Sequence, residues 1–363
     1  MNNIPPSKIV RKKTRQSNIE LLRCISMFFV LMLHVNYVCV GDVQYSDLVN
    51  NPLNASTRMF LEHLSIVAVN VFVLISGWFS IHPTWKSVSN LLFQVMFFSF
   101  LLLGWQILFY DVPSTLNMFL SLYPGGTLWF IPAYLGLMVL APILNSFAEH
   151  ASRRQFLMVL FSFFTFQLFY GLLKDLAHFH YGYSTFSFVG IYLLARYMYL
   201  YPIRWFSNKS FIDFVVLYVK TMALNTTLHA LSIYIGIPGD KVFGIVYNAP
   251  LVILGSVFLL LAFTRISIQS RIVNAAGKSC FAIYLIHVNM YVAPFYIAFY
   301  KNIYDEYSGL IYMLFVFITL CIVGIVCILI DKIRIYCWNK VYPLLEEGVS
   351  KIQSPCFVSD FHE

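Results

Sequence analysis

Long apolar runs, separated by short polar segments, dominate this sequence. Ten of these runs approach or exceed the length that a helix needs to cross a bilayer, about 20 residues. The pattern therefore predicts an all-α integral membrane protein with about ten transmembrane helices. The predicted spans cover residues 19–40, 60–81, 88–110, 127–147, 155–174, 185–201, 211–236, 244–264, 279–299 and 309–331.

The basic residues give an independent indication of topology, because cytoplasmic segments of membrane proteins are enriched in Lys and Arg. With the N-terminus in the cytoplasm, the inner segments hold 17 of the 24 Lys and Arg residues and the outer loops hold four. A single miscounted helix would invert every later loop and remove this bias. We therefore predict that both termini lie in the cytoplasm and that the protein is a multi-pass protein of the cell (cytoplasmic) membrane.

Composition agrees with this class. Hydrophobic residues make up 60% of the chain and charged residues 11%, with a mean hydropathy of +0.74. A soluble domain carries about 25% charged residues. The net charge of +8 is scattered between apolar runs, so it indicates topology and we expect no nucleic-acid partner. The predicted organisation is a basic cytoplasmic tail (1–18), one transmembrane domain (19–335) and a cytoplasmic C-terminal tail (336–363).

Ionisable side chains inside a membrane are costly, so each is a functional candidate. Arg23 and His34 lie in the first predicted helix, eleven residues apart, which is about three helical turns. They therefore share one face, roughly 16 Å apart along the axis. An Arg at the cytoplasmic end suits a phosphate-bearing ligand, and a deeper His suits general-base or nucleophilic work. Snorkelling of Arg23 and a structural role for His34 are the alternatives.

Four segments resemble one family of membrane proteins. The Arg23-x10-His34 pattern in NIELLRCISMFFVLMLHV is similar to the first-helix signature of the acyltransferase-3 family. AVNVFVLISGWF (68–79), LWFIPAYLGLMVLAPIL (128–144) and KSCFAIYLIHV (278–288) resemble three later blocks of that family. The four blocks occur in the family's order, and the resemblance covers about residues 17–335.

The resemblance implies about ten core helices and transfer of an acyl group, mostly acetyl, from cytoplasmic acetyl-CoA to an extracytoplasmic glycan. It implies a catalytic role for His34 and an acyl-CoA-binding role for Arg23. Two positions depart from the family pattern: Asn70 stands where many relatives have Asp, and Thr127 where many have His. A carboxylate at position 70 cannot be assumed, and no catalytic role is carried to either position.

Several other residues are candidates by location. Arg196 is expected to hold a second phosphate of coenzyme A or to snorkel, and Lys220, deep in its predicted helix, to face a polar cavity or an acidic partner. Glu62 and His63 open the second span from outside and suit an acceptor sugar, although interfacial residues are usually only solvated. The remaining candidates for lining the site are His287, Asn70, Trp129 and Tyr134.

The sequence thus favours a membrane O-acetyltransferase that acts on a surface polysaccharide (capsule, O-antigen or exopolysaccharide) or its lipid-linked precursor. Acetyl-CoA is expected as co-substrate, with membrane lipids as surroundings and no bound cofactor. We predict no metal site, since His178 and His180 lack a third ligand nearby. A transporter or flippase of a lipid-linked sugar or acyl donor is the main alternative, and a glycan polymerase is a third. Oligomeric state, acceptor sugar and acyl group stay open.

Overall fold

The computed structural model describes residues 15–110, 128–237 and 239–352, and these form helices and connecting turns without any strand. The π-helical turns His34–Cys39 and Leu168–Leu172 extend two of the α-helices. The α-helices are α1 (Ser17–Leu33), α2 (Tyr45–Asn50), α3 (Pro52–Ile66), α4 (Ala68–Phe79), α5 (Trp85–Phe109), α7 (Phe130–His150), α8 (Arg153–Gln167), α9 (Thr185–Leu200), α10 (Arg204–Ser207), α11 (Phe211–Ile235), α12 (Asp240–Phe243), α13 (Pro250–Thr264), α14 (Arg271–Ser279), α15 (Phe281–His287), α16 (Ala293–Glu306) and α17 (Gly309–Ile352).

Seven helical stretches in the described chain are long and apolar enough to cross a membrane. Each falls on one of the ten predicted spans, so the multi-pass helical class is confirmed. The count of ten is not reached by this criterion. The seven are Ser17–Cys39, Pro52–Phe79, Trp85–Phe109, Phe130–His150, Arg153–Leu172, Phe211–Ile235 and Gly309–Glu347.

The other three predicted spans differ from ordinary transmembrane helices. The run 185–201 folds as α9, which has 16 residues, and the run 244–264 folds as α13, which has 15. Most side chains of α13 are buried, with Leu254 among the few exceptions, so its apolar sequence faces mainly protein rather than lipid. The prediction of one continuous helix over 279–299 is wrong: α15 ends at His287 and α16 begins at Ala293.

Local sequence signals set several helix ends. Capping boxes begin α5 at Thr84, α8 at Ser152 and α11 at Ser210. In a capping box, the side chain of the capping residue accepts from a backbone N–H of the first turn, and a side chain of that turn accepts from the backbone N–H of the capping residue. Helix α11 ends at Gly236, whose φ of +77° is the left-handed conformation that glycine adopts without strain. These three capping boxes fall in segments that the charge pattern assigns to the cytoplasm, and a fourth, at Gln44 before α2, falls in a predicted outer loop.

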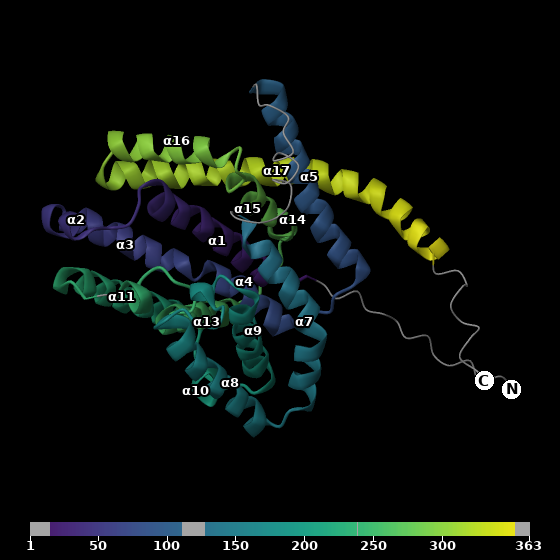
Figure 1. Cartoon of the computed structure of the whole chain (residues 1–363), viewed down its shortest axis with the longest axis horizontal. Coiled ribbons are helices and arrows are strands. Elements are labelled where there is room, and N and C mark those ends of the chain that lie inside the picture. The colour runs from purple at the N-terminus through teal and green to yellow at the C-terminus, as the bar shows by residue number, and fades with distance from the viewer. Residues whose placement is uncertain (1–14, 111–127, 238, 353–363) are drawn as a thin grey trace.

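Helix α1 lies inside the bundle and packs against α3, α4, α13, α14, α15 and α17 (Figure 1). Its first turn is tied to two other segments: the Asn18 side chain donates to the Phe263 carbonyl (2.8 Å), and Ser17 exchanges hydrogen bonds with Ser270. Near its other end, the Tyr296 hydroxyl of α16 donates to the Leu31 carbonyl (3.2 Å). The helix that carries Arg23 and His34 is therefore fixed at both ends.

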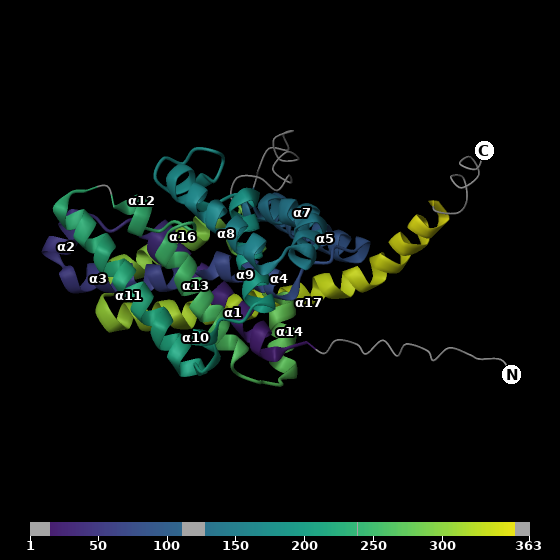
Figure 2. The same cartoon turned by 90° about the horizontal axis from the view of Figure 1, so that it is seen from below.

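Helix α17 runs beside α16 and then extends past the rest of the bundle (Figures 1 and 2). We call the end of the bundle that contains Glu20, Arg23 and Lys278 the inner end. The opposite end, which contains Gly41, Arg58 and Tyr304, is the outer end. The charge pattern predicts that the inner end faces the cytoplasm.

Candidate active site

One face of α1 borders an apolar cavity of ≈ 50 Å³. Met27, Val30 and His34 line it at helical spacing, with His34 toward the outer end. Arg23 precedes Met27 by four residues and so occupies the same face, one turn closer to the inner end. The structure therefore places an apolar cavity along the face between Arg23 and His34. The other lining residues are Val69, Phe72, Trp129, Phe130, Tyr247, Phe281 and Tyr284.

The backbone changes where His34 lies. Helix α1 widens at this residue into a π-helical turn that runs to Cys39. Such turns are rare and often occur at functional sites, because they leave carbonyl groups without their usual partners. Side chains satisfy the neighbouring carbonyls here: Asn36 donates to Met32 (3.0 Å) and Tyr296 donates to Leu31.

His34 is paired with a second histidine. Its Nδ1 lies 2.8 Å from Nε2 of His287, a hydrogen bond between residues 253 positions apart in the chain. His287 is the last residue of α15 and is buried, and its own Nδ1 lies 2.6 Å from the Ile283 carbonyl oxygen. His287, expected to line the site, thus directly contacts His34, the proposed catalytic residue.

Aromatic side chains form the wall opposite α1. Trp129, predicted to line the site, does so and packs against Tyr247 with 5.6 Å between ring centroids. Phe130 stacks on Tyr134 at 5.4 Å, and the Tyr134 hydroxyl forms a 3.0 Å hydrogen bond with Ser76. Tyr134 therefore supports the wall from behind rather than lining the cavity itself.

Arg23 has an ion-pair partner that the Arg23-x10-His34 motif does not predict. Its guanidinium donates to the Glu20 carboxylate at 2.8 Å, one helical turn away, and Arg15 approaches the same oxygen to 3.5 Å. The Arg23 side chain keeps about one third of its surface exposed. Glu20 thus fixes the orientation of Arg23 and leaves part of its guanidinium available to a ligand.

Further basic groups surround this inner end. Burial, and then the neighbouring charges of Arg15 and Arg334, lower the pKa of the Lys278 side chain. Lys332 lies beside it and donates to the Ser279 hydroxyl at 3.1 Å. This concentration of positive charge favours an anionic ligand, such as a phosphate, at the inner end of α1.

A second, more polar cavity of ≈ 300 Å³ lies at the outer end. Tyr37, Asp42, Gln44, Glu62 and His229 are among its lining residues, so two carboxylates face it, and none of the lining residues whose side chains the structure describes is Lys or Arg. Glu62 is buried, and its Oε1 accepts no hydrogen bond from the described residues. The same chain segments wall both cavities: Tyr37 follows His34 by three residues, and Val246 of the outer cavity precedes Tyr247 of the inner one.

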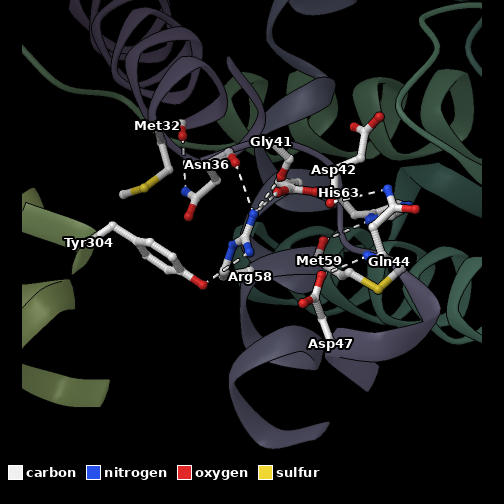
Figure 3. Close-up of polar contacts among 11 residues, drawn as sticks. Met32, Asn36, Gly41, Asp42, Gln44, Asp47, Arg58, Met59, His63 and Tyr304 are labelled. Carbon is white, nitrogen blue, oxygen red and sulfur yellow. Dashed lines mark hydrogen bonds and ion pairs between the residues drawn. The ribbon is translucent and has the colours of Figure 1, made fainter. Parts of the chain in front are cut away.

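Arg58 braces the segment that forms this outer cavity (Figure 3). Its guanidinium donates to the carbonyls of Gly41 (2.5 Å) and Asn36 (3.3 Å) and to the Tyr304 hydroxyl (3.4 Å). It lies 4.0 Å from Glu62, which is one turn further along α3. Arg58 is itself buried, so it links the end of α1 to α3 and α16 and holds Glu62 in place.

Two predicted residues do not join the site. Arg196 donates to the Trp78 carbonyl at the end of α4 (3.3 Å) and lies over the Tyr199 ring, which is a structural arrangement. Lys220 is exposed on α11 and makes no ion pair within the described chain, so the expected polar cavity or acidic partner is absent there. A functional role for Lys220, like the binding of a phosphate by Arg196, stays a prediction.

His63 and Asn70 connect helices rather than face either cavity. Both ring nitrogens of His63 lie near carbonyl oxygens, of Met59 (2.7 Å) and Phe243 (2.9 Å). Asn70 donates to the Tyr247 carbonyl at 2.7 Å. Because Tyr247 lines the inner cavity, Asn70 positions a wall of the site, whereas His63 supports the chain beside the outer cavity.

Sequence reasoning missed Glu20, Ser76 and Asp42. The three-residue spacing of Glu20 and Arg23 in one helix was a usable signal for an ion pair. No local signal marks Ser76, whose partner Tyr134 lies 58 positions away, or Asp42, which lines the outer cavity together with Glu62 of another segment. No group of three or more His, Cys, Asp or Glu residues within the described ranges has a metal-binding arrangement. Thr127 lies outside the described residues.

The fold and the site define a polytopic helical membrane protein with a histidine pair above an apolar intramembrane cavity. The sequence matches the model of the acyltransferase-3 family, described as an acyltransferase domain, over residues 16–331. The chain belongs to this family, as its motifs predict, and is a membrane acyltransferase. No curated protein and no solved structure matches it.

Proposed function

We propose that the protein is an O-acetyltransferase that moves an acetyl group from cytoplasmic acetyl-CoA to a hydroxyl of an extracytoplasmic surface glycan or its lipid-linked precursor. One observation carries this proposal: a single face of α1 presents Arg23 at the inner end, an apolar cavity in the middle and His34 toward the outer end. This order matches a donor with a phosphate-bearing head, an uncharged arm and a reactive thioester at its tip.

Cavity size favours a short acyl group. A single water needs about 10–15 Å³ by the same measure of volume, so ≈ 50 Å³ accommodates a group of a few heavy atoms. Acetyl meets this limit and a long fatty acyl chain exceeds it, so the cavity suits the acetyl tip of the donor, and the arm would have to widen the passage from Arg23 as it enters. The small, apolar cavity also favours an enzyme over a transporter, which would need a path for a whole polar sugar.

In the reaction, the acceptor hydroxyl gives its proton to His34 as its oxygen bonds to the thioester carbonyl carbon. The tetrahedral intermediate then breaks its carbon–sulfur bond, and coenzyme A leaves as a thiol with the proton returned by His34. The alternative is that His34 attacks the thioester itself and carries the acetyl group as a covalent intermediate. Both routes need an unprotonated ring nitrogen of His34 at the cavity.

The outer cavity supplies the acceptor side of the proposal. Its volume of ≈ 300 Å³ lies at the lower end of the range for ligand sites, about 300–1,000 Å³. Asp42, Gln44 and Glu62 offer oxygens that accept hydrogen bonds from sugar hydroxyls. Because two carboxylates line the cavity, and no Lys or Arg does so among the described side chains, an uncharged or amino sugar fits it better than an acidic one.

Replacing His34 tests the catalytic role. We expect the His34→Ala variant to lose acetyl ester from the surface polysaccharide, since removal of a general base costs about 10²–10⁴-fold in rate. The measurement is mass spectrometry of surface glycans from cells that carry equal amounts of membrane-inserted wild-type or variant protein. His178→Ala is the matched control, since His178 is an exposed histidine outside both cavities. Normal acetylation by the His34→Ala protein would refute the catalytic role.

A further inference from the structure

We propose that His287 is a positioning residue that fixes the tautomer of His34, so that Nε2 of His34 is the nitrogen that accepts the proton during acyl transfer. The proposal rests on the acetyltransferase function argued above and names the atom and the residue that control it. It begins from two distances: His287 Nδ1 to the Ile283 carbonyl oxygen, 2.6 Å, and His34 Nδ1 to His287 Nε2, 2.8 Å.

The first distance determines the state of His287. A carbonyl oxygen only accepts hydrogen bonds, so the proton between the two atoms belongs to Nδ1 of His287. A neutral imidazole carries one N–H, and Nε2 of His287 is therefore an acceptor. His287 is buried and faces the rings of Tyr284 and Tyr296, and no charged group among the described residues contacts it, which favours the neutral form.

The second distance then determines the state of His34. Because His287 Nε2 accepts, His34 Nδ1 must donate, and the proton of neutral His34 resides on Nδ1. Its Nε2 keeps the lone pair. No described residue forms a hydrogen bond with that nitrogen, and His34 lines the inner cavity. The carbonyl–His287–His34 chain thus presents a proton-accepting nitrogen to the substrate.

The same chain serves the second half of the reaction. When Nε2 takes the acceptor proton, His34 becomes a cation with protons on both nitrogens. Its Nδ1–H still donates to His287, and this charge-assisted bond is stronger than the neutral one. No proton needs to move between the two rings. His34 then gives the Nε2 proton to the sulfur of the departing coenzyme A and returns to its starting tautomer.

The fold explains why His287 is available for this task. The span predicted as one helix stops at His287 and resumes at Ala293, so the imidazole lies at a helix end beside α1. The Tyr296 hydroxyl, which donates to the Leu31 carbonyl, ties the following helix to α1 near the pair. Helix packing alone does not require the second histidine, because Tyr296 already bridges the two helices.

The first test compares substitutions at His287 in membranes that contain the endogenous acceptor, with radiolabelled acetyl-CoA as donor. We expect His287→Leu to lower kcat by roughly 10²–10⁴-fold, the range for losing a general base or its orienting group, with the KM for acetyl-CoA unchanged. His287→Gln keeps an oxygen that accepts from His34 Nδ1, so it should recover part of the loss. Tyr296→Phe, which removes a helix contact but not the tautomer control, should retain kcat.

A second test fixes the tautomer chemically. In the His287→Ala background, replacement of His34 by Nδ1-methylhistidine leaves Nε2 as the unprotonated nitrogen without help from position 287, and the vacated space holds the methyl group. We expect this double variant to transfer acetyl at least ten times faster than His287→Ala alone. A purely structural role for His287 predicts no such rescue.

Wild-type kcat in His287→Leu, or no rescue by Nδ1-methylhistidine in a protein that melts at the same temperature as its parent, would overturn the proposal. These outcomes are separate from failure of the proposed function. If His34→Ala also retained full acetyl transfer, the function of His34 itself would be wrong. If His34→Ala were inactive and His287→Leu fully active, only the tautomer proposal would fail.

Discussion

Individual residues in this site depend on partners that are distant in the chain. Glu62 shows this well: it is buried in α3, lies 4.0 Å from Arg58 and has a carboxylate oxygen without a hydrogen bond in the described structure. A buried acceptor without a partner is costly unless something else satisfies it. In the proposed function, a hydroxyl of the acceptor sugar supplies that partner.

We therefore expect Glu62→Gln to reduce acetyl ester on the surface polysaccharide roughly ten-fold, because a hydrogen bond to a charged group is worth about 1.5–3 kcal/mol. Binding of acetyl-CoA should be unchanged, since Glu62 lies at the outer end. The measurements are glycan mass spectrometry and thermal stabilisation by acetyl-CoA. Asp305→Asn, an exposed acidic residue near the outer end, is the control. Full acetylation by Glu62→Gln would remove Glu62 from the acceptor site.

Pairs of helices are held at close distance by small residues. Gly77 of α4 faces α9, and a Cβ placed there would collide with the Tyr192 carbonyl and approach the Ala195 Cβ to 2.9 Å. Gly104 of α5 is the opposite case, because no other atom lies within 4 Å of the position that a Cβ would occupy there. Substituting alanine at each of the two glycines therefore distinguishes the cost of a tight helix contact at Gly77 from the general effect of glycine in a helix, seen at Gly104.

We expect Gly77→Ala to lower the free energy of unfolding by about 1–3 kcal/mol, the usual cost of overpacking a tight contact. Gly104→Ala should be neutral or stabilising by up to about 1 kcal/mol, because alanine favours the helix more than glycine does. Thermal unfolding of the detergent-purified variants measures both. Equal melting temperatures for the two would show that α4 and α9 are not closely packed.

At the scale of the whole molecule, the inner end is basic and the outer end carries two carboxylates beside a cavity. In the proposed function, this asymmetry sets the direction of transfer: the donor enters from the inner end and the acceptor from the outer end, with His34 between them. It also separates an acetyltransferase from a transporter, because only the enzyme is expected to bind acetyl-CoA at the inner end.

Acetyl-CoA should therefore stabilise the purified protein against heat, by about 2.7 kcal/mol at a concentration of 100 times Kd. Arg23→Ala should weaken Kd roughly 10- to 100-fold through loss of charged hydrogen bonds, and Arg204→Ala, an exposed basic residue of α10, should leave it unchanged. Thermal shift titrations measure both. Absence of any stabilisation would favour the transporter alternative, and equal Kd in Arg23→Ala would end its role in donor binding.

Much of this organisation was predictable from local patterns. Apolar runs located the helices, and the three-turn spacing placed Arg23 and His34 on one face, because helical periodicity depends only on nearby residues. Lys220 shows the limit of such patterns: its position along the helix followed from the sequence, but the sequence did not show that its side of α11 is exposed. Likewise, Arg196 donates a hydrogen bond to a carbonyl of α4, a contact that sequence spacing could not predict.

The sequence by itself thus determined the membrane class, the family and the two residues on the face of α1, since these follow from composition, motifs and short-range periodicity. Tertiary structure decided which side chains meet that face. The break after His287, the contact of His287 with His34 and the outer cavity between Asp42 and Val246 join residues far apart in the chain. Such contacts depend on how helices pack, which is set by the whole set of side chains rather than by any one segment.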